Sequence, residues 1–325
     1  MTQAPAGAQG EPMSDAQTVL SPTPPPWPRW QALWALTRPG FLWLSISAAA
    51  VGLAKQGRLQ SDDLWRSVFV LALIALAHAA INAWNDVHDA RSGADRDNQA
   101  RIAPFCGGSR ALQEGRLHIG DAQRLVWVLT ACVIGGGVAL SLLSQPVLGL
   151  VGLLGMLLGW AYSAPPFALM RHGWGELTVA LCWALIPIGA HLALSGSLSL
   201  DLWLIALGPA LGACAILVIA NVADLQADAA NGKRTLVVRF GALRALQGFI
   251  LLQAALWILL VYAVSTARLP ALSLLALLAL PFSGYAVWLA RRARSQRDPL
   301  KLAIPAAIHT SLIYNLGLAF GLGLS

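Results

Sequence analysis

The hydrophobic residues of this chain lie in long, nearly uncharged runs that are separated by shorter polar connections. With its flanks, each run is long enough to cross a hydrocarbon core of about 30 Å as a helix. Because hydrocarbon offers no hydrogen-bond partner to the backbone, such runs should be α-helical. The pattern predicts an all-α, polytopic membrane protein with nine transmembrane helices. Their centres are at residues 41–54, 64–84, 122–143, 146–163, 176–195, 202–222, 245–265, 270–290 and 302–323.

Two parts of the chain depart from this pattern. Residues 1–29 are rich in proline and contain no long apolar run, so they are predicted to be a disordered tail that precedes one domain, residues 30–325. Residues 82–115 are densely polar but directly follow an apolar run, so the first of them should still lie on a helix that is leaving the membrane. Polar groups are costly at that position, which makes this stretch the first candidate for a functional site.

Composition supports a membrane protein and excludes several other classes. Hydrophobic residues make up 57% of the chain and charged residues 11%, whereas a soluble domain has roughly a quarter charged residues. The formal charge is +7, but the basic residues lie in short loops and not on one basic domain, which argues against a nucleic-acid partner. The four cysteines form no CxxC pair and the histidines no HxxxH pattern, so neither disulfides nor zinc are expected. No protein partner is predicted.

Lysine and arginine are distributed unequally between the two sides of the predicted bundle. Of the 22, the N-terminal flank and the loops after the second, fourth, sixth and eighth segments hold 18. The other four are Lys55, Arg58, Arg66 and Arg268. Because Lys and Arg are enriched in cytoplasmic loops, the N-terminus and the long polar loops are predicted to be cytoplasmic and the C-terminus external. Glycines at 135–137, 152, 155 and 159 indicate close helix contacts.

A polar pattern, N-x-x-[ND]-x-x-x-D, occurs twice, at the ends of the second and sixth segments. The copies are Asn82, Asn85 and Asp89 and, 139 residues later, Asn221, Asp224 and Asp228. This spacing places each triplet on one helix face, and Asp86 widens the first face. An even number of crossings separates the copies, so both faces emerge on the same side of the membrane. An alternative is that these residues are only solvated charges at helix ends. In that case, two matching faces at the same depth would be a coincidence.

The chemistry of these faces indicates a bound cation. No lysine lies on either face, and Asp and Asn oxygens suit Mg²⁺, which is usually shared with the phosphates of a substrate. Basic residues follow both triplets: Arg91, Arg96, Arg101 and Arg110 after the first, and Lys233, Arg234 and Arg239 after the second. Carboxylates and guanidinium groups around one site predict a magnesium–diphosphate site.

These motifs resemble the UbiA superfamily of intramembrane prenyltransferases over nearly the whole chain after the tail. Asn85-Asp86-x-x-Asp89 is similar to the first aspartate motif of the family, and Asp224-x-x-x-Asp228 with the following GKRTL to the second. The YSAPP sequence at 162–166, the stretch 171–176 and the pair Arg38-Pro39 are similar to further family segments. The runs 92–95, 104–105 and 107–110 most resemble the 1,4-dihydroxy-2-naphthoate polyprenyltransferase branch, which serves menaquinone synthesis. One departure is Gly93, where many relatives have a third aspartate; Asp95 is the nearest substitute.

The resemblance implies nine helices around a central cavity with cytoplasmic cap loops, in a bacterial inner membrane. It implies transfer of a polyprenyl group from polyprenyl diphosphate to a small aromatic acceptor. The implied Mg²⁺ ligands are Asn85, Asp86, Asp89, Asp224 and Asp228, the four aspartates also being catalytic, and Arg91, Lys233 and Arg234 would bind the diphosphate. Tyr162 would be catalytic, stabilising an allylic carbocation through its ring, and Arg38, Asn82, Arg171 and Asn221 would bind the acceptor.

Several alternatives stay open at this point. The acceptor could instead be 4-hydroxybenzoate, a chlorophyllide, haem, or a sugar or lipid phosphate. Tyr162 could be an interfacial aromatic residue, and Arg38 and Arg171 ordinary cytoplasmic charges. A secondary transporter is the alternative from another class. It is disfavoured because the acidic residues gather at one membrane face and no segment is interrupted at the midplane by paired charges.

Overall fold

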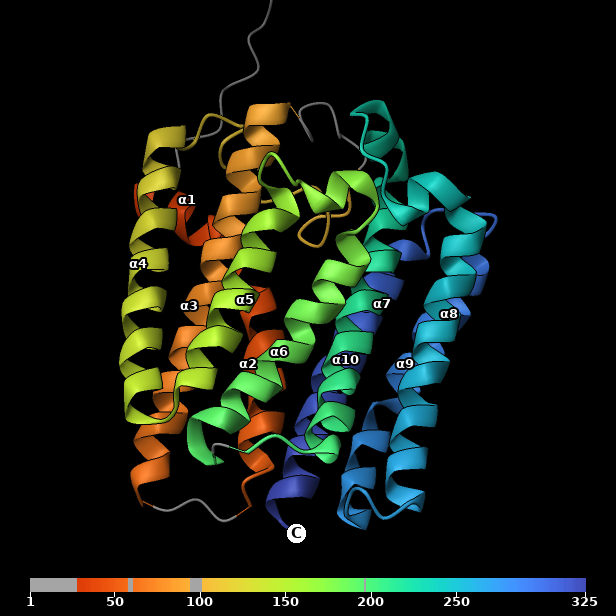
Figure 1. Ribbon diagram of the computed structural model, residues 1–325. Coiled ribbons are helices and arrows are strands. Elements are labelled where there is room, and N and C mark those ends of the chain that lie inside the picture. The colour runs from red at the N-terminus through yellow and green to blue at the C-terminus, as the bar shows by residue number, and fades with distance from the viewer. Residues whose placement is uncertain (1–27, 58–60, 94–100, 196) are drawn as a thin grey trace, which may run out of the picture.

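The computed structural model describes residues 28–57, 61–93, 101–195 and 197–325, and the regular structure within these ranges is entirely helical (Figure 1). Its elements are α1 (Arg29–Leu36), α2 (Pro39–Ala54), α3 (Ser61–Ser92), α4 (Ile119–Leu143), α5 (Pro146–Ser163), η1 (Leu169–His172), α6 (Gly175–Ser195), α7 (Leu200–Ala230), α8 (Leu236–Ser265), η2 (Ala271–Ala279), α9 (Leu280–Arg292) and α10 (Leu300–Gly323). Within the described ranges, eight spans are long and apolar enough to cross a membrane, and the bent pair α1–α2 makes a ninth. The predicted fold class, a polytopic all-α membrane protein, is confirmed.

The first crossing is broken between α1 and α2, which meet at 42°. Pro39 begins α2 and disfavours helical backbone at the preceding residue, and Arg38 adopts the left-handed conformation with φ 50°. With 16 residues, α2 extends roughly 24 Å, so it needs α1 to complete a crossing. Helix α1 was not predicted as a separate element. The predicted tail, except for its last two residues, lies outside the described part of the chain.

Helices α3 and α7 are the longest in the described chain, with 32 and 31 residues. Since about 20 residues suffice to cross the hydrocarbon, their last turns extend beyond it and carry the two polar triplets, as the sequence predicted. Helix α7 is the central helix. In its most apolar stretch of 18 residues, 67% is buried, whereas the corresponding stretch of α4 is 11% buried. It packs against α6, α8 and α10, so its carboxylates are held by the best-packed part of the bundle.

Close helix contacts are made at some of the predicted glycines. A Cβ at Gly136 would come within 2.5 Å of a Leu73 methyl group, and one at Gly159 within 2.3 Å of an Ile81 methyl group. The other four glycines predicted for such contacts face open space. A close approach to backbone that was not predicted occurs at Gly317 of α10, where a Cβ would stand 2.6 Å from a carbonyl oxygen of η2.

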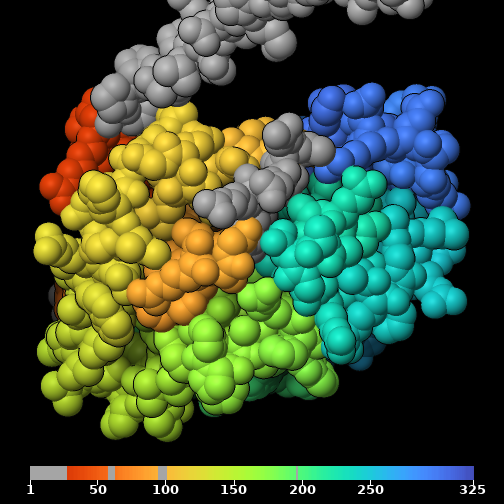
Figure 2. All heavy atoms as spheres, turned by 90° about the horizontal axis from the view of Figure 1, so that it is seen from above, coloured from red at the N-terminus to blue at the C-terminus, as the bar shows by residue number. Residues whose placement is uncertain are grey.

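The ends of α3 and α7 lie at one end of the bundle, and the C-terminus lies at the other (Figure 1). Figure 2 looks down on the first of these faces, where the end of α3 (orange) lies between α4 (yellow) and the α7–α8 region (teal). The connection from α5 to α6, which contains η1, belongs to the same face (Figure 1). The candidate site is therefore built at this end of the molecule.

Candidate functional site

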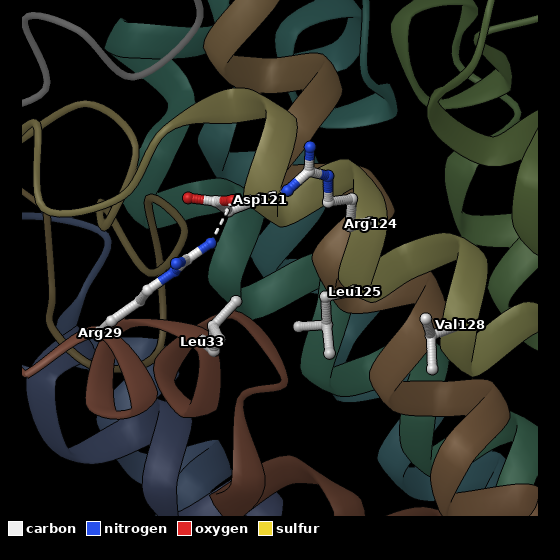
Figure 3. Close-up of a pocket in the computed structure, with 6 residues that line it drawn as sticks. All are labelled: Arg29, Leu33, Asp121, Arg124, Leu125 and Val128. Atoms are coloured by element: carbon white, nitrogen blue, oxygen red, sulfur yellow. Dashed lines mark hydrogen bonds and ion pairs between the residues drawn. The ribbon is translucent and has the colours of Figure 1, made fainter.

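Two hollows of the bundle lie away from the predicted site. A hollow of about 230 Å³ lies between α1 and α4, where Arg29 pairs with Asp121 above an apolar floor (Figure 3). Its lining is Arg29, Leu33, Asp121, Arg124, Leu125 and Val128. A second hollow, of about 380 Å³, is lined by alanine and leucine side chains of η2. No predicted site residue lines either hollow, and the central cavity stays a prediction.

Asp86, which widens the face of the first polar triplet, is 1% exposed. Its carboxylate pairs with the guanidinium group of Arg38 and accepts a hydrogen bond of 3.0 Å from the backbone N–H of Ser109. Arg38 Nη2 also lies 3.3 Å from the side-chain oxygen of Asn85. The left-handed backbone at the α1–α2 break thus presents Arg38 to the end of α3.

The second triplet meets the first through Lys233. The Nζ atom of Lys233 lies 3.4 Å from a carboxylate oxygen of Asp89 on α3 and 3.4 Å from one of Asp228 on α7. All three side chains are less than 10% exposed. One buried cation therefore bridges equivalent positions of the repeat, and the two predicted faces do face each other.

The turn from α7 to α8 has a sequence-encoded shape that places Lys233. Gly232 adopts φ +69°, which suits glycine, and the N–H of Lys233 donates to the carbonyl of Asp228 at 2.9 Å. Thr235 then caps α8 by accepting from the N–H of Val238. Arg171 clamps the turn, since its Nη2 donates to the carbonyl of Asn231 at 2.9 Å.

The loop before α4 forms a second bridge between the triplets. The backbone N–H of Gly107 donates to Asp224 at 3.2 Å, and that of Ser109 donates to Asp86 at 3.0 Å. Positive φ angles at Gly107 and Gly108 allow this short segment to direct both N–H groups at the helix ends. Cys106, in the same loop, is buried, and burial raises the pKa of its thiol, with Asp224 adding to the effect. The four cysteines are free in the structure.

The structure changes one premise of the sequence argument. No lysine shares a helix face with the carboxylates, but Lys233 and Arg38 reach them from neighbouring segments. Within the described ranges, no three His, Cys, Asp or Glu side chains gather closely enough to hold a metal ion by themselves. The site is a set of carboxylates interleaved with cations and backbone donors.

The remaining predicted asparagines contact protein groups, whereas the remaining predicted arginines are exposed. Asn82 donates to the carbonyl of Thr37 at 3.0 Å and Asn221 to Glu176 at 3.1 Å, so both bond between helices or segments. Arg91 and Arg234 have exposed side chains. The backbone N–H of Arg234 donates to the carbonyl of Arg171 at 2.8 Å, which joins the α7–α8 turn to η1. Asp95, the proposed substitute for the third aspartate, lies outside the described residues.

Tyr162 and Glu176 border the bridged carboxylates from the α5 and α6 side. The ring of Tyr162 lies against Gly175, the residue before Glu176, and Glu176 accepts a hydrogen bond from Asn221, one turn before Asp224 on α7. Glu176 is 3% exposed and was not among the predicted site residues. An acidic residue at the start of an apolar helix was the available signal, but in the sequence it is not distinguishable from an ordinary first-turn carboxylate.

Comparisons with known proteins agree on one family. Residues 41–312 match the family described as the UbiA prenyltransferase family. A 1,4-dihydroxy-2-naphthoate octaprenyltransferase from Haemophilus influenzae is 30% identical over 250 residues, which cover 72% of this chain and 77% of that protein. A chloroplastic chlorophyll synthase from Avena sativa is 27% identical over 45% of this chain and 39% of its own length. The structure of a UbiA homologue from Archaeoglobus fulgidus bound to GPP and Mg²⁺ superposes with a TM-score of 0.64 at 20% identity, covering 90% of this chain and 99% of that one.

Proposed function

Since this chain belongs to the UbiA prenyltransferase family and is a multi-pass membrane transferase, we propose that it transfers a polyprenyl group from polyprenyl diphosphate to 1,4-dihydroxy-2-naphthoate. The observation that carries the proposal is the double bridge between the two triplets, through Lys233 and through the loop at 107–109. It gathers carboxylates and cations at one end of an apolar bundle. A lipid substrate with a charged head requires both environments side by side.

The donor set fits Mg²⁺ shared with a diphosphate. Mg²⁺ commonly keeps several waters and takes one or two carboxylates together with substrate phosphates, so a closed protein cage is not required. The oxygens of Asn85, Asp86, Asp89, Asp224 and Asp228 are the proposed ligands. Bound there, Mg²⁺ would neutralise charge on the leaving diphosphate. That a UbiA homologue was solved with GPP and Mg²⁺ bound supports the choice of Mg²⁺ as the metal.

The side chains of the chain itself would bind the head of the donor and protect the reactive end of its tail. Lys233 is already at the carboxylates and is the first candidate to bind a diphosphate oxygen. Arg91 and Arg234, both exposed, could reach the diphosphate only from the polar side of the site. The allylic C–O bond breaks with its electrons going to the diphosphate, and the ring of Tyr162 would stabilise the positive charge left on carbon. An electron-rich ring carbon of the acceptor then forms a C–C bond to that carbon, and loss of a proton from the ring restores aromaticity. The surrounding apolar helices exclude the water that would quench it.

The acceptor is assigned from relatives and from its chemistry. The Haemophilus influenzae relative is named for 1,4-dihydroxy-2-naphthoate and covers most of both chains, whereas the chlorophyll synthase match covers less than half of either. A hydroxylated aromatic acid also suits guanidinium groups. The proposed acceptor-binding residues are Arg38, Asn82, Arg171 and Asn221. Two of them, Arg171 and Asn82, donate to protein carbonyls in the structure.

We also propose a bacterial inner-membrane location with the site on the cytoplasmic side. The distribution of Lys and Arg supports this orientation. The site, the loop before α4 and the α7–α8 turn all belong to the end of the bundle that is opposite the C-terminus (Figure 1).

An acceptor panel tests the proposed reaction. Purified protein would be incubated with Mg²⁺, radiolabelled polyprenyl diphosphate and one of 1,4-dihydroxy-2-naphthoate, 4-hydroxybenzoate or a chlorophyllide. We expect a prenylated naphthalene product and at most a minor product with the other two. A dominant product from another acceptor would reassign the substrate, and no product from any acceptor would contradict aromatic prenyl transfer.

A further inference from the structure

Glu176 is a buried carboxylate with one oxygen in use and one unused. It lies in the first turn of α6 and is 3% exposed. Its Oε1 accepts a hydrogen bond of 3.1 Å from the side-chain amide of Asn221. Its Oε2 has no hydrogen-bond partner among the described residues. A buried polar atom without a partner is costly, so a bound ligand that donates a hydrogen bond to this oxygen would remove that cost.

The surroundings of Glu176 place it between the charged cluster and the apolar interior. Asn221, which donates to Glu176, lies on α7 one turn before Asp224 of the charged cluster. On the other side of Asn221, the preceding turn of α7 carries the buried apolar side chains of Val218 and Ile219. Glu176 therefore stands where the head of the donor would give way to its hydrocarbon tail.

Local structure holds the carboxylate in this position. Gly175 packs against Tyr162, whose ring carbon would be 3.4 Å from a Cβ at that glycine. Glu176 lies in the first turn of α6, where the N-terminal end of the helix favours a negative charge. Asn221 fixes the side chain from α7, one turn before Asp224. Helices α5, α6 and α7 thus orient the carboxylate of Glu176.

We propose that Glu176 Oε2 accepts a hydrogen bond from a ring hydroxyl of the aromatic acceptor, and that Asn221 is the positioning residue that orients it. This inference rests on the proposed function. A carboxylate is an acceptor-only group when ionised, whereas an aromatic hydroxyl is a good donor, and such charge-assisted hydrogen bonds are strong. A site of this kind selects a free hydroxyl over an ether, because the ether leaves the buried oxygen unpaired. Glu176 would therefore determine acceptor specificity.

A second buried polar group in the same bundle provides a matched control. Asn315 on α10 is 0% exposed, donates to Ser47 Oγ at 3.1 Å, and also has an unpartnered oxygen, Oδ1. Its side chain is neutral and lies away from the carboxylate cluster, bonded to α2. If an unsatisfied interhelical contact were the whole role of Glu176, substitutions at the two positions should have similar effects.

The test compares 1,4-dihydroxy-2-naphthoate with its mono-O-methyl ethers in the full-length protein with Mg²⁺ and polyprenyl diphosphate. In Glu176→Gln, the amide can donate to an ether oxygen, so we expect the preference for the hydroxyl form, as the ratio of kcat/KM values, to fall by about 10- to 100-fold. The KM for polyprenyl diphosphate should not change. Glu176→Asp should retain most of the preference, and Asn315→Ala should retain it while lowering the thermal midpoint.

The inference is contradicted if Glu176→Gln keeps the wild-type preference or if Asn315→Ala loses it equally. Should Glu176→Gln fail to fold, Glu176→Asp decides: a raised acceptor KM with an unchanged donor KM supports the assignment, and equal changes in both contradict it. Failure of the proposed function looks different, because the wild-type protein would then prenylate none of the aromatic acceptors.

Discussion

At the scale of single residues, the best-defined feature is the buried lysine between two carboxylates. Lys233 was predicted from its place after the second motif, as a residue for the diphosphate. Its contacts with Asp89 and Asp228 could not be predicted, because they depend on the positive φ of Gly232 and on Arg171 holding the turn. Asp86 was identified from helix spacing, but its pairing with Arg38 required a left-handed residue before a proline. Glu176 lacked any distinguishing pattern.

Removing the bridge should destabilise the protein. In Lys233→Ala, two buried carboxylates lose a common cation, and we expect a loss of about 3 kcal/mol in the free energy of unfolding. Thermal unfolding in detergent would show this as a lowered midpoint. The matched control is Lys301→Ala, since Lys301 pairs with Asp298 at 2.8 Å but both side chains are exposed; its midpoint should not move. Equal midpoints for the two variants would show that the buried bridge contributes nothing to stability.

At the scale of elements, the predicted segments and the observed helices agree closely because hydrophobic runs determine where the chain crosses a membrane. The lengths of α3 and α7 follow from the polar triplets that continue their helical spacing. Two features were not visible in the pattern. The break between α1 and α2 depends on one residue pair, and the bridging role of the loop before α4 depends on backbone N–H groups, which every sequence contains.

The loop contact can be tested at one glycine. A Cβ at Gly108 would lie 3.1 Å from the Asp86 carboxylate and 3.6 Å from Arg38 Nη2, so Gly108→Ala should push the loop away from the site. We expect at least about a tenfold loss of prenyl transfer, roughly what 1.4 kcal/mol of transition-state stabilisation produces. Gly115→Ala is the control, because Gly115 has nearly the same φ, +67° against +66°, with nothing within 4 Å of its Cβ position. Similar activity in both variants would mean that backbone strain, and not the contact with Asp86, explains the loss.

At the scale of the whole molecule, an odd number of crossings separates the site from the C-terminus. The site lies at the end of the bundle where α3 and α7 finish, and the central helix α7 fixes it to the best-packed core. The sequence predicted this arrangement because the repeat spans an even number of crossings. It could not predict which space receives the substrate, because that space depends on side-chain packing between helices.

The orientation of the molecule gives a direct labelling experiment. In a background without the native cysteines, Glu114→Cys, in the loop before α4, should react with a membrane-impermeant maleimide only from the cytoplasmic side. Ala267→Cys, in the connection between α8 and η2, should react only from the outside, because both positions are exposed at opposite ends of the bundle. Reaction with the opposite sidedness would reverse the proposed topology.

The central claim is that carboxylates on the ends of α3 and α7 act together in one Mg²⁺-dependent prenyl transfer. The most direct measurement is the rate of transfer from radiolabelled polyprenyl diphosphate to 1,4-dihydroxy-2-naphthoate as a function of Mg²⁺, in wild-type protein and in Asp86→Asn and Asp228→Asn. We expect no product without Mg²⁺, saturation as Mg²⁺ rises, and a rate lowered by at least about 100-fold in each variant, because each removes a charge that stabilises the transition state. Wild-type rates in chelator, or in both variants, would contradict the claim.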